Sequence, residues 1–274
     1  VAAREASVYM ATTVGEYYRK QGLNVLILAD STSRWAQALR ETSGRKEEIP
    51  GPEAFPMYIS TLISAFYDRA GVELLPDNSS GSLSIIGTVS PAGGNFDEPV
   101  TQATLLSTGA FWGLSRNLSD ARKYPAIDRI DSTSKYPSLL EVEEVSYLIE
   151  LLRDGKAIAS NIILMGEKGI PDEIYIRYQK AELVDTVFLQ QNSFHEVDGV
   201  TKPERLRQMF DMVKEIIEAP IVLHGKEKIR SHFNFLRQAF LDWNYLSMNS
   251  ESYENQKSKL LKMNKMMDYA PENV

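Results

Sequence analysis

The chain has 274 residues, a formal charge of −7 at pH 7 and no cysteine. The absence of cysteine excludes disulfide frameworks, cysteine-based metal sites and thiol nucleophiles, and the acidic balance disfavours nucleic acid as the main partner. No apolar run reaches the roughly 20 residues of a membrane-spanning helix, so we expect contact with a membrane only through other proteins.

Helical and strand patterns alternate along the first half of the chain. Apolar residues at helical spacing predict helices, and short aliphatic runs bounded by glycine, proline or polar residues predict strands. The predicted helices cover about 4–21, 33–42, 58–71 and 100–109, and the predicted strands cover 24–30, 82–90 and 110–115. This alternation is typical of an α/β domain with a mostly parallel sheet and helices on its faces.

From about residue 137 the pattern becomes helical throughout. Four long segments follow the 3.6-residue period, and the tail over 249–274 predicts a final helix. Pro171 and Pro203 stand at the starts of two segments, where the first helical turn tolerates proline. We therefore predict an α/β domain over 1–136 and a helical domain over 137–274. The opening helical pattern has no capping residue, which predicts a piece of a longer protein.

The stretch "VLILADSTSRW" is the most informative motif of the α/β half. A continuous aliphatic run predicts a strand buried on both faces, and ligands of doubly wound sheets bind beyond the carboxyl ends of the strands. Asp30 occupies such an end, where a carboxylate can hold Mg²⁺ through water opposite the phosphates of a nucleotide. Arg34 can neutralise phosphate charge.

An ordinary helix cap explains the same spacing. Asp30 or Ser31 can serve as the N-cap of the helix that follows, and an apolar run ending in aspartate is a weak motif by itself. A triphosphate site also needs the phosphate-binding loop G-x-x-x-x-G-K-[ST] upstream of the aspartate, and this sequence does not contain it. A nucleotide site built on Asp30 would therefore depend on residues outside this chain.

At "LADSTSRWAQALRE", residues 28–41, the sequence resembles the catalytic A subunit of V-type rotary ATPases. Six further segments agree in the same order: "VAAREAS" at 1–7, "ISAFYDRAG" at 63–71, "VSPAGGNFDEPVT" at 89–101, "FWGL" at 111–114, "SKYPSLL" at 134–140 and "FLQQNSFHEVD" at 188–198. The resemblance implies the second half of a RecA-like P-loop domain with a parallel sheet, followed by a C-terminal helical bundle.

The resemblance also implies roles for individual residues. Asp30 resembles the Walker B aspartate that helps to hold Mg²⁺, and Arg34 the arginine close to the terminal phosphate. Tyr124 and Phe194 correspond to aromatic rings beside the adenine, with Gln190 and Gln191 next to Phe194. Without the family, packing a loop is as ordinary an interpretation of Tyr124 as binding a base, and the residues alone favour Phe194 as a core aromatic residue.

The Gly-Pro loop "SPAGGNFDEP", residues 90–99, has a family role as well. Ser90 and the backbone around Gly93 and Gly94 are expected to face the neighbouring subunit near the nucleotide. One segment departs from the A-subunit pattern: "YPAIDRIDSTSKY" is closer to F-type β subunits. The aromatic residue before proline is kept, so adenine stacking stays expected, whereas the contacts of Asp128 and Asp131 are left open.

The function implied by the resemblance is ATP hydrolysis or synthesis coupled to proton or sodium translocation. The cofactors would be ATP or ADP with Mg²⁺. The partners would be B subunits in an alternating A3B3 hetero-hexamer, the central rotor stalk and the peripheral stalk, on the cytoplasmic side of a membrane. The phosphate-loop lysine and the water-orienting glutamate would lie outside this chain, so we expect the isolated chain to be inactive.

Two other classes share part of the pattern. Flagellar or type III export ATPases have a strand ending in Asp-Ser, but they lack the "SPAGGNFDEP" loop. A non-catalytic nucleotide-binding subunit is a regulatory alternative, and the Asp-Ser-Thr-Ser-Arg-Trp run disfavours it. The three histidines show no metal-ligand spacing.

Overall fold

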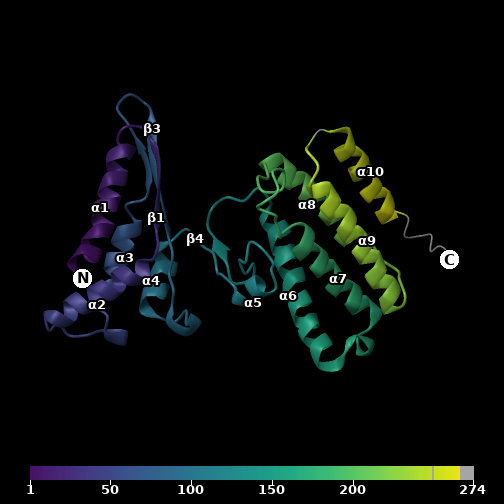
Figure 1. The fold of residues 1–274 in the computed structure, drawn as a ribbon, viewed down its shortest axis with the longest axis horizontal. Coiled ribbons are helices and arrows are strands. Elements are labelled where there is room, and N and C mark those ends of the chain that lie inside the picture. Colours follow the sequence, from purple (N-terminus) through teal and green to yellow (C-terminus); the bar gives the residue numbers. More distant parts are fainter. Residues whose placement is uncertain (249, 266–274) are drawn as a thin grey trace. The chain divides into compact units, whose positions relative to one another are not determined.

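The computed structural model describes residues 1–248 and 250–265 and divides into two compact units (Figure 1). The first unit is Val1–Phe111 and the second is Trp112–Val274. The first contains a three-stranded sheet with helices, and the second is mainly helical. The predicted order, α/β followed by helical, is confirmed.

The sheet of the first unit has the strand order β1-β3-β2. Strands β1 (Asn24–Ala29) and β3 (Ser80–Gly87) run parallel, whereas β2 (Gly71–Leu74) pairs antiparallel with β3. Strand β2 was not predicted from the sequence, which ended a helix at Gly71 and assigned no element to residues 72–74. Because β2 and β3 are joined by a short turn, the antiparallel pairing is the one a hairpin allows.

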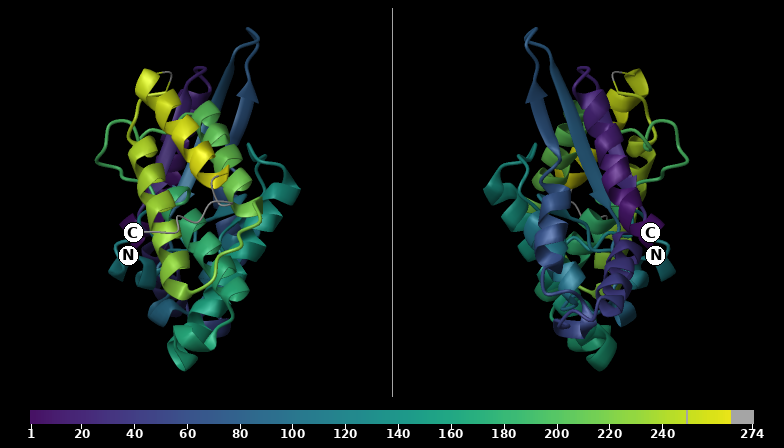
Figure 2. Two further views of the ribbon diagram at one scale, coloured as in Figure 1. Left: turned by 90° about the vertical axis from the view of Figure 1, so that its right-hand side faces the viewer. Right: turned by 90° about the vertical axis from the view of Figure 1, so that its left-hand side faces the viewer.

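One face of β1 carries the helix α1 (Ala2–Arg19), which lies along the sheet (Figure 2). Val25, Ile27 and Ala29 are half-buried on alternate positions, while Leu26 and Leu28 keep 55% and 70% of their surface exposed. The expectation of a strand buried on both faces is therefore wrong within the described residues. The physical reason is that no described element covers the face of Leu26 and Leu28.

Three helices build the core beside the carboxyl ends of the strands. They are α2 (Thr32–Arg45), α3 (Ile59–Tyr67) and α4 (Pro99–Ser107), with the 3-10 turns η1 (Pro52–Ala54) and η2 (Ala92–Gly94) in the connecting loops. Trp35 and Phe66, each 3% exposed, pack with ring centroids 5.7 Å apart in this core. The amphipathic spacing of α2 and α3 thus buries the apolar face of each helix.

The second unit is built on five long helices. They are α6 (Val142–Met165), α7 (Asp172–Val187), α8 (Pro203–Glu218), α9 (Lys226–Asn244) and α10 (Glu251–Lys265), with the 3-10 turn η3 (Glu167–Gly169) before α7. Helix α7 contacts α6 and α9, and α10 packs on α9. Tyr175, Phe210, Phe233 and Trp243 are almost wholly buried in the shared core. Part of the predicted tail helix is thus observed as α10; residues 249 and 266–274 lie outside the described residues.

The predicted proline positions agree with the observed helix starts. Pro171 is the N-cap of α7, and Pro203 is in the first turn of α8. At the start of α6 the carboxylates of Glu141 and Glu144 form a reciprocal capping box. This capping box satisfies backbone N–H groups that have no partner inside the helix.

The stretch before α6 belongs structurally to the second unit. It contains the helix α5 (Arg116–Asp120) and the strand β5 (Thr133–Ser134), and the first unit ends with β4 (Ala110–Phe111). The compact units thus meet between Phe111 and Trp112, earlier than the domain boundary predicted at 136. Contacts of this stretch with α7, described below, explain the difference. The boundary of the functional domains stays a prediction.

Candidate functional site

The first group of predicted site residues lies where β1 and β3 end. Ala29 and Gly87 are paired in the parallel register, so Asp30 and Thr88 follow neighbouring strand ends. The Thr88 N–H donates to the carbonyl of Ala29 at 3.0 Å, and the Thr32 N–H donates to the carbonyl of Thr88 at 3.0 Å. Backbone hydrogen bonds therefore join the start of α2 to the end of β3.

Asp30 is exposed, and its carboxylate is oriented by the neighbouring strand. The hydroxyl of Thr88 donates to Oδ1 of Asp30 at 2.9 Å, while Oδ2 accepts no hydrogen bond from any residue that the structure describes. The N-cap of α2 is Ser31, and no side chain caps this helix. The helix-cap interpretation thus holds for the position of Ser31, although its side chain makes no capping bond, and is wrong for Asp30. One carboxylate oxygen of Asp30 is free for a ligand.

Serine and threonine side chains continue this polar cluster. The buried Thr32 hydroxyl donates to the carbonyl of Thr88 at 3.0 Å. Ser33 Oγ accepts from the backbone N–H of Ser90 at 2.9 Å. Ser90 is exposed, and this bond fixes the start of the Gly-Pro loop against α2. The structure thus brings Ser90 and the turn after Asp30 together through the hydroxyl of Ser33.

Arg34 lies in the first turn of α2 and is exposed. Its backbone N–H donates to the carbonyl of Ser31 at 3.2 Å, and its guanidinium forms no ion pair with the described residues. The loop after Ser90 turns at Gly93 and Gly94, whose φ angles of 65° and 73° favour glycine. The cluster therefore offers a carboxylate, hydroxyls, an unpaired cation and a tight backbone loop.

The second group of predicted site residues lies in the helical unit. Tyr124 precedes Pro125 and is 51% exposed. The backbone N–H of Gln191 donates to the carbonyl of Tyr124 at 2.9 Å. This bond ties the segment of Tyr124 to the loop over residues 190–201, which follows α7. The structure thus brings Tyr124 and Gln191 together, although they are far apart in the sequence.

Asp185 of α7 holds the Tyr124 segment in place, a role that sequence reasoning missed. Lys123 Nζ lies 2.6 Å from Oδ2 of Asp185, and Arg129 Nη1 lies 3.6 Å from Oδ1. Arg129 also donates to the carbonyl of Leu189 at 3.2 Å. Nothing in the sequence around Asp185 indicates this role. It follows only from the contacts with Lys123 and Arg129, which are far from Asp185 in the sequence.

The contacts of Asp128 and Asp131, which the sequence left open, are visible in the structure. Oδ1 of Asp128 accepts from the backbone N–H groups of Ile130 at 2.9 Å and Asp131 at 3.3 Å. Oδ2 of Asp128 lies 3.7 Å from Nζ of Lys156. Asp128 thus shapes its own turn, and Asp131 is exposed.

Phe194 and Gln191 occupy opposite environments in the loop over residues 190–201. Phe194 is 99% exposed, so the alternative of a core aromatic residue is wrong. Nε2 of Gln191 donates to the carbonyl of Asp198 at 2.7 Å and to Thr201 Oγ1 at 3.1 Å. The Gln191 side chain therefore stabilises the loop, while Phe194 projects from it.

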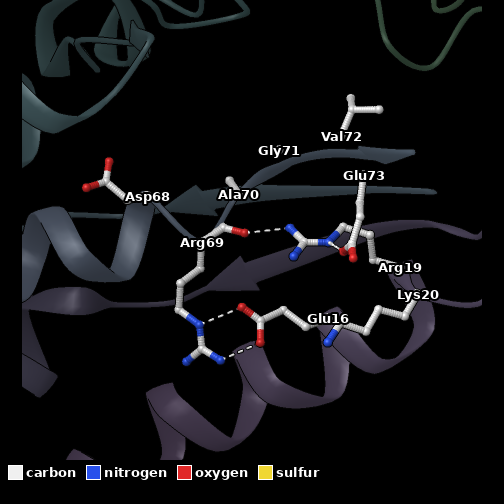
Figure 3. A pocket seen from close by; sticks show the side chains of 9 residues that line it. All are labelled: Glu16, Arg19, Lys20, Asp68, Arg69, Ala70, Gly71, Val72 and Glu73. Atoms are coloured by element: carbon white, nitrogen blue, oxygen red, sulfur yellow. Dashed lines mark hydrogen bonds and ion pairs between the residues drawn. The ribbon is translucent and has the colours of Figure 1, made fainter. Parts of the chain in front are cut away.

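A charged hollow of about 560 Å³ lies elsewhere in the first unit, beside the end of α1 (Figure 3). Nε and Nη2 of Arg69 donate to the two carboxylate oxygens of Glu16 at 2.7 and 2.6 Å, and Nε of Arg19 donates to Glu73 at 3.0 Å. The bond from Arg69 lowers the pKa of the Glu16 carboxyl. Because these charges are paired with one another, the hollow has a structural role: the ion pairs join α1 to β2 and to the turn that precedes β2.

The described residues contain no group of three or more acidic or histidine side chains able to bind a metal by themselves. A cation at Asp30 would therefore share its coordination with a ligand. None of the described helices has both the length and the apolar character needed to cross a bilayer.

Comparison with known proteins gives consistent matches. Residues 1–134 match the ATP synthase alpha/beta family, nucleotide-binding domain. The V-type ATP synthase alpha chain of Treponema denticola is 53% identical over 262 residues, which are 96% of this chain and 44% of that relative. The corresponding chain of Borrelia turicatae is 50% identical over 98% of this chain and 47% of its own length. This chain thus spans about half the length of these relatives.

The fold also matches a solved structure. The ATP synthase subunit NeqB of Nanoarcheaum equitans superposes with a TM-score of 0.66 at 25% identity. The match covers 78% of this chain and 53% of NeqB. The matches to the two relatives, over 96% and 98% of this chain, and to NeqB, over 78% of this chain, therefore include parts of both the α/β unit and the helical unit.

Proposed function

We propose, on the premise that the chain belongs to the ATP synthase alpha/beta family, that it is part of the catalytic subunit of a V-type rotary ATPase. The observation that carries the proposal is the free Oδ2 of Asp30 at the carboxyl edge of a parallel strand pair, where such sheets bind ligands. The chemistry is phosphoryl transfer between ATP and water, or its reversal, which depends mainly on positioning and charge stabilisation.

The residues around Asp30 fit a magnesium ion held through water. Carboxylate oxygens are preferred Mg²⁺ ligands, and the ion keeps several waters that hydroxyl groups can orient. When bound, Mg²⁺ neutralises charge on the phosphate oxygens. Asp30 would hold the ion, Thr88 fixes the rotamer of Asp30, and Arg34 would bind the terminal phosphate.

Tyr124 and Phe194 would bind the adenine ring of ATP or ADP. Both rings are exposed, and an aromatic face binds a purine through apolar area and stacking. Gln191 contributes by holding the loop of Phe194, since its amide is engaged inside the loop. Ser90 and the Gly93–Gly94 turn would face the neighbouring subunit.

We propose that the edge of β1 that is not paired with β3 receives further strands of the same domain. Among the described residues only β3 pairs with β1, and Leu26 and Leu28 are uncovered. An apolar groove of about 460 Å³ adjoins this edge, lined by Met10, Ala11, Val14, Gly15, Tyr18, Val25, Leu26 and Ile27. An unpaired apolar edge is a template for strand addition. The relatives have the additional length to supply such strands.

In the assembled enzyme the partners would be B subunits in an A3B3 hexamer, the central rotor stalk and the peripheral stalk. The complex would translocate protons or sodium ions from the cytoplasmic side of a membrane. This chain lacks a phosphate-binding loop, so by itself it would neither hydrolyse ATP nor bind it tightly.

Calorimetric titration with Mg-ATP and a phosphate-release assay test the proposal. We expect the chain alone to show no turnover and no binding tighter than about 1 mM, near −4 kcal/mol. Assembly with the rest of the subunit and with B subunits should restore turnover, and Asp30→Asn should remove it. Steady turnover by the chain alone, or full turnover of the assembled Asp30→Asn enzyme, would contradict the proposal.

A further inference from the structure

We propose that Asp198 is a positioning residue that holds Phe194 in its exposed, ring-binding orientation. The inference rests on the proposed role of Phe194 in binding the base. Asp198 is 6% exposed, whereas Phe194, four residues earlier in the same loop, is 99% exposed. A buried carboxylate in the same loop as an exposed aromatic ring requires an explanation, because burying a charge is costly unless it is hydrogen-bonded.

The buried Asp198 carboxylate forms a hydrogen bond across the loop over residues 190–201. Its Oδ2 accepts from the backbone N–H of Asn192 at 2.6 Å, a charge-assisted hydrogen bond. The carbonyl of Asp198 accepts from Gln191 Nε2 at 2.7 Å and from Thr201 Oγ1 at 3.4 Å. One residue thus receives hydrogen bonds from both ends of the loop.

Asn192, whose backbone is bound by Asp198, is in turn hydrogen-bonded to the backbone of Phe194. Oδ1 of Asn192 accepts from the backbone N–H of Phe194 at 3.1 Å. The carbonyl of Asn192 accepts from the N–H of His195 at 3.1 Å. The backbone on both sides of the Phe194 ring is therefore fixed by the residue that Asp198 binds.

His195 and Gly199 complete the turn. Nδ1 of His195 accepts from the N–H groups of Val197 at 3.2 Å and Asp198 at 3.4 Å, and its ring lies 4.3 Å from that of Tyr245. A Cβ on Gly199 would lie 2.9 Å from the carbonyl oxygen of His195. The loop therefore closes on itself with no room for a side chain at this point.

The consequence is a preorganised aromatic platform. An exposed phenylalanine gains nothing from burial, so packing does not fix the orientation of its ring. A loop ordered before binding avoids the entropy cost of ordering it in the complex. A purely stabilising Asp198 would alter unfolding without altering nucleotide affinity, and this difference separates the two roles.

Hydrogen exchange of this chain measures the positioning directly. We expect Asp198→Ala to speed exchange of the Asn192 and Phe194 amides at least about tenfold, since their hydrogen bonds depend on the carboxylate. Asp198→Asn keeps an acceptor oxygen and should restore most of the protection. The matched control is Glu196→Ala, which removes an exposed carboxylate from the same loop and should change neither amide.

The KM for ATP of the assembled enzyme tests the consequence for binding. Phe194→Ala should raise KM about three- to tenfold, the range of one aromatic stacking contact. Asp198→Ala should raise KM similarly with kcat unchanged, and Asp198→Asn should rescue it. In the Phe194→Ala background, Asp198→Ala should add nothing, because the two residues then act as one unit. If Asp198→Ala prevents folding, Asn192→Ala, at an exposed position, removes the side-chain acceptor of the Phe194 N–H and keeps the backbone bond to Asp198, so it tests the second half of the connection.

The outcomes separate the two hypotheses. If Phe194→Ala raises KM and Asp198→Ala does not, or if their effects add, the positioning role is overturned while the base contact stands. If Phe194→Ala leaves KM unchanged, the base contact fails, and the positioning role fails with it. Faster exchange without any change in KM would leave Asp198 as a stabilising residue only.

Discussion

The hydroxyl of Thr88 donates a hydrogen bond to Oδ1 of Asp30 at 2.9 Å, joining two residues that follow different strands. The parallel register of β1 and β3 brings these strand ends together. The bond occupies one oxygen of the carboxylate and leaves the other free of protein partners among the described residues. Thr88 thereby sets the direction in which Asp30 presents its charge.

Thr88→Val should weaken magnesium binding without removing the ligand itself. Loss of a partner that orients a metal ligand costs about 10- to 100-fold in metal affinity or activity. We expect the Mg²⁺ concentration for half-maximal ATPase activity of the assembled enzyme to rise at least about tenfold. The measurement is a Mg²⁺ titration at saturating ATP.

The control for this substitution is Thr61→Val on α3. Thr61 is exposed and its hydroxyl has no hydrogen bond to the described residues, so its replacement should leave the Mg²⁺ titration unchanged. An unchanged titration for Thr88→Val would show that Asp30 does not depend on the strand-end contact.

Glu144 makes the stability of the helical unit sensitive to acid. Hydrogen bonds from Arg207, at 2.8 and 3.1 Å, lower the pKa of the Glu144 carboxyl to about 2, with further contributions from the Glu141 N–H and Lys214. The ordinary value is 4.5, so the unfolded chain binds this proton at higher pH than the folded chain. The stabilisation is therefore complete above about pH 4.5 and is lost as the pH falls towards 2.

Glu144→Gln should flatten this pH dependence. We expect its free energy of unfolding, from urea denaturation, to fall less between pH 4.5 and pH 2 than that of the unaltered chain. Glu143→Gln is the matched control, because Glu143 is exposed in the same helical turn and forms no ion pair with the described residues. Equal slopes for both variants would remove Glu144 from this role.

Arg205, in the first turn of α8, binds backbone carbonyl groups at the C-terminal end of α9. It is 5% exposed, and its guanidinium donates to the carbonyls of Leu246 at 2.9 Å, Trp243 at 3.5 Å and Asn244. Arg205→Met should destabilise the helical unit by about 2–4 kcal/mol, because buried carbonyls lose their donors. Arg153→Met, at an exposed position of α6, should stay within about 0.5 kcal/mol. Denaturant unfolding of both variants provides the comparison.

Gly155 and Gly44 should respond in opposite directions to alanine. A Cβ on Gly155 of α6 would lie 2.5 Å from the Cβ of Ala181 on α7, so Gly155→Ala should destabilise by about 1–3 kcal/mol through overpacking. Gly44 of α2 has nothing within 4 Å of such a Cβ, so Gly44→Ala should stabilise by about 0.5–1 kcal/mol. Scanning calorimetry of the two variants measures both changes in stability. Stabilisation by Gly155→Ala would contradict the prediction and mean that α6 and α7 can move apart to accept the methyl group.

Local patterns in the sequence determined most of the helices and the type of each unit. The 3.6-residue period predicted α6 to α9, and the aliphatic run before Asp30 predicted β1. These features follow from the spacing of apolar residues and from proline at first turns, which are local properties. The strand end at Asp30 likewise identified Asp30 and Arg34 as candidates, and the family resemblance added Tyr124 and Phe194.

Tertiary structure alone decided which residues meet. Strand β2 escaped prediction because its pairing with β3 is antiparallel and short. The Thr88 contact of Asp30 and the Asp185 contacts of Lys123 and Arg129 join residues more than 50 positions apart, and sequence spacing carries no information about such pairs. Burial is likewise non-local: one carboxylate of "FHEVD" is exposed and the other, Asp198, is enclosed by the loop it supports.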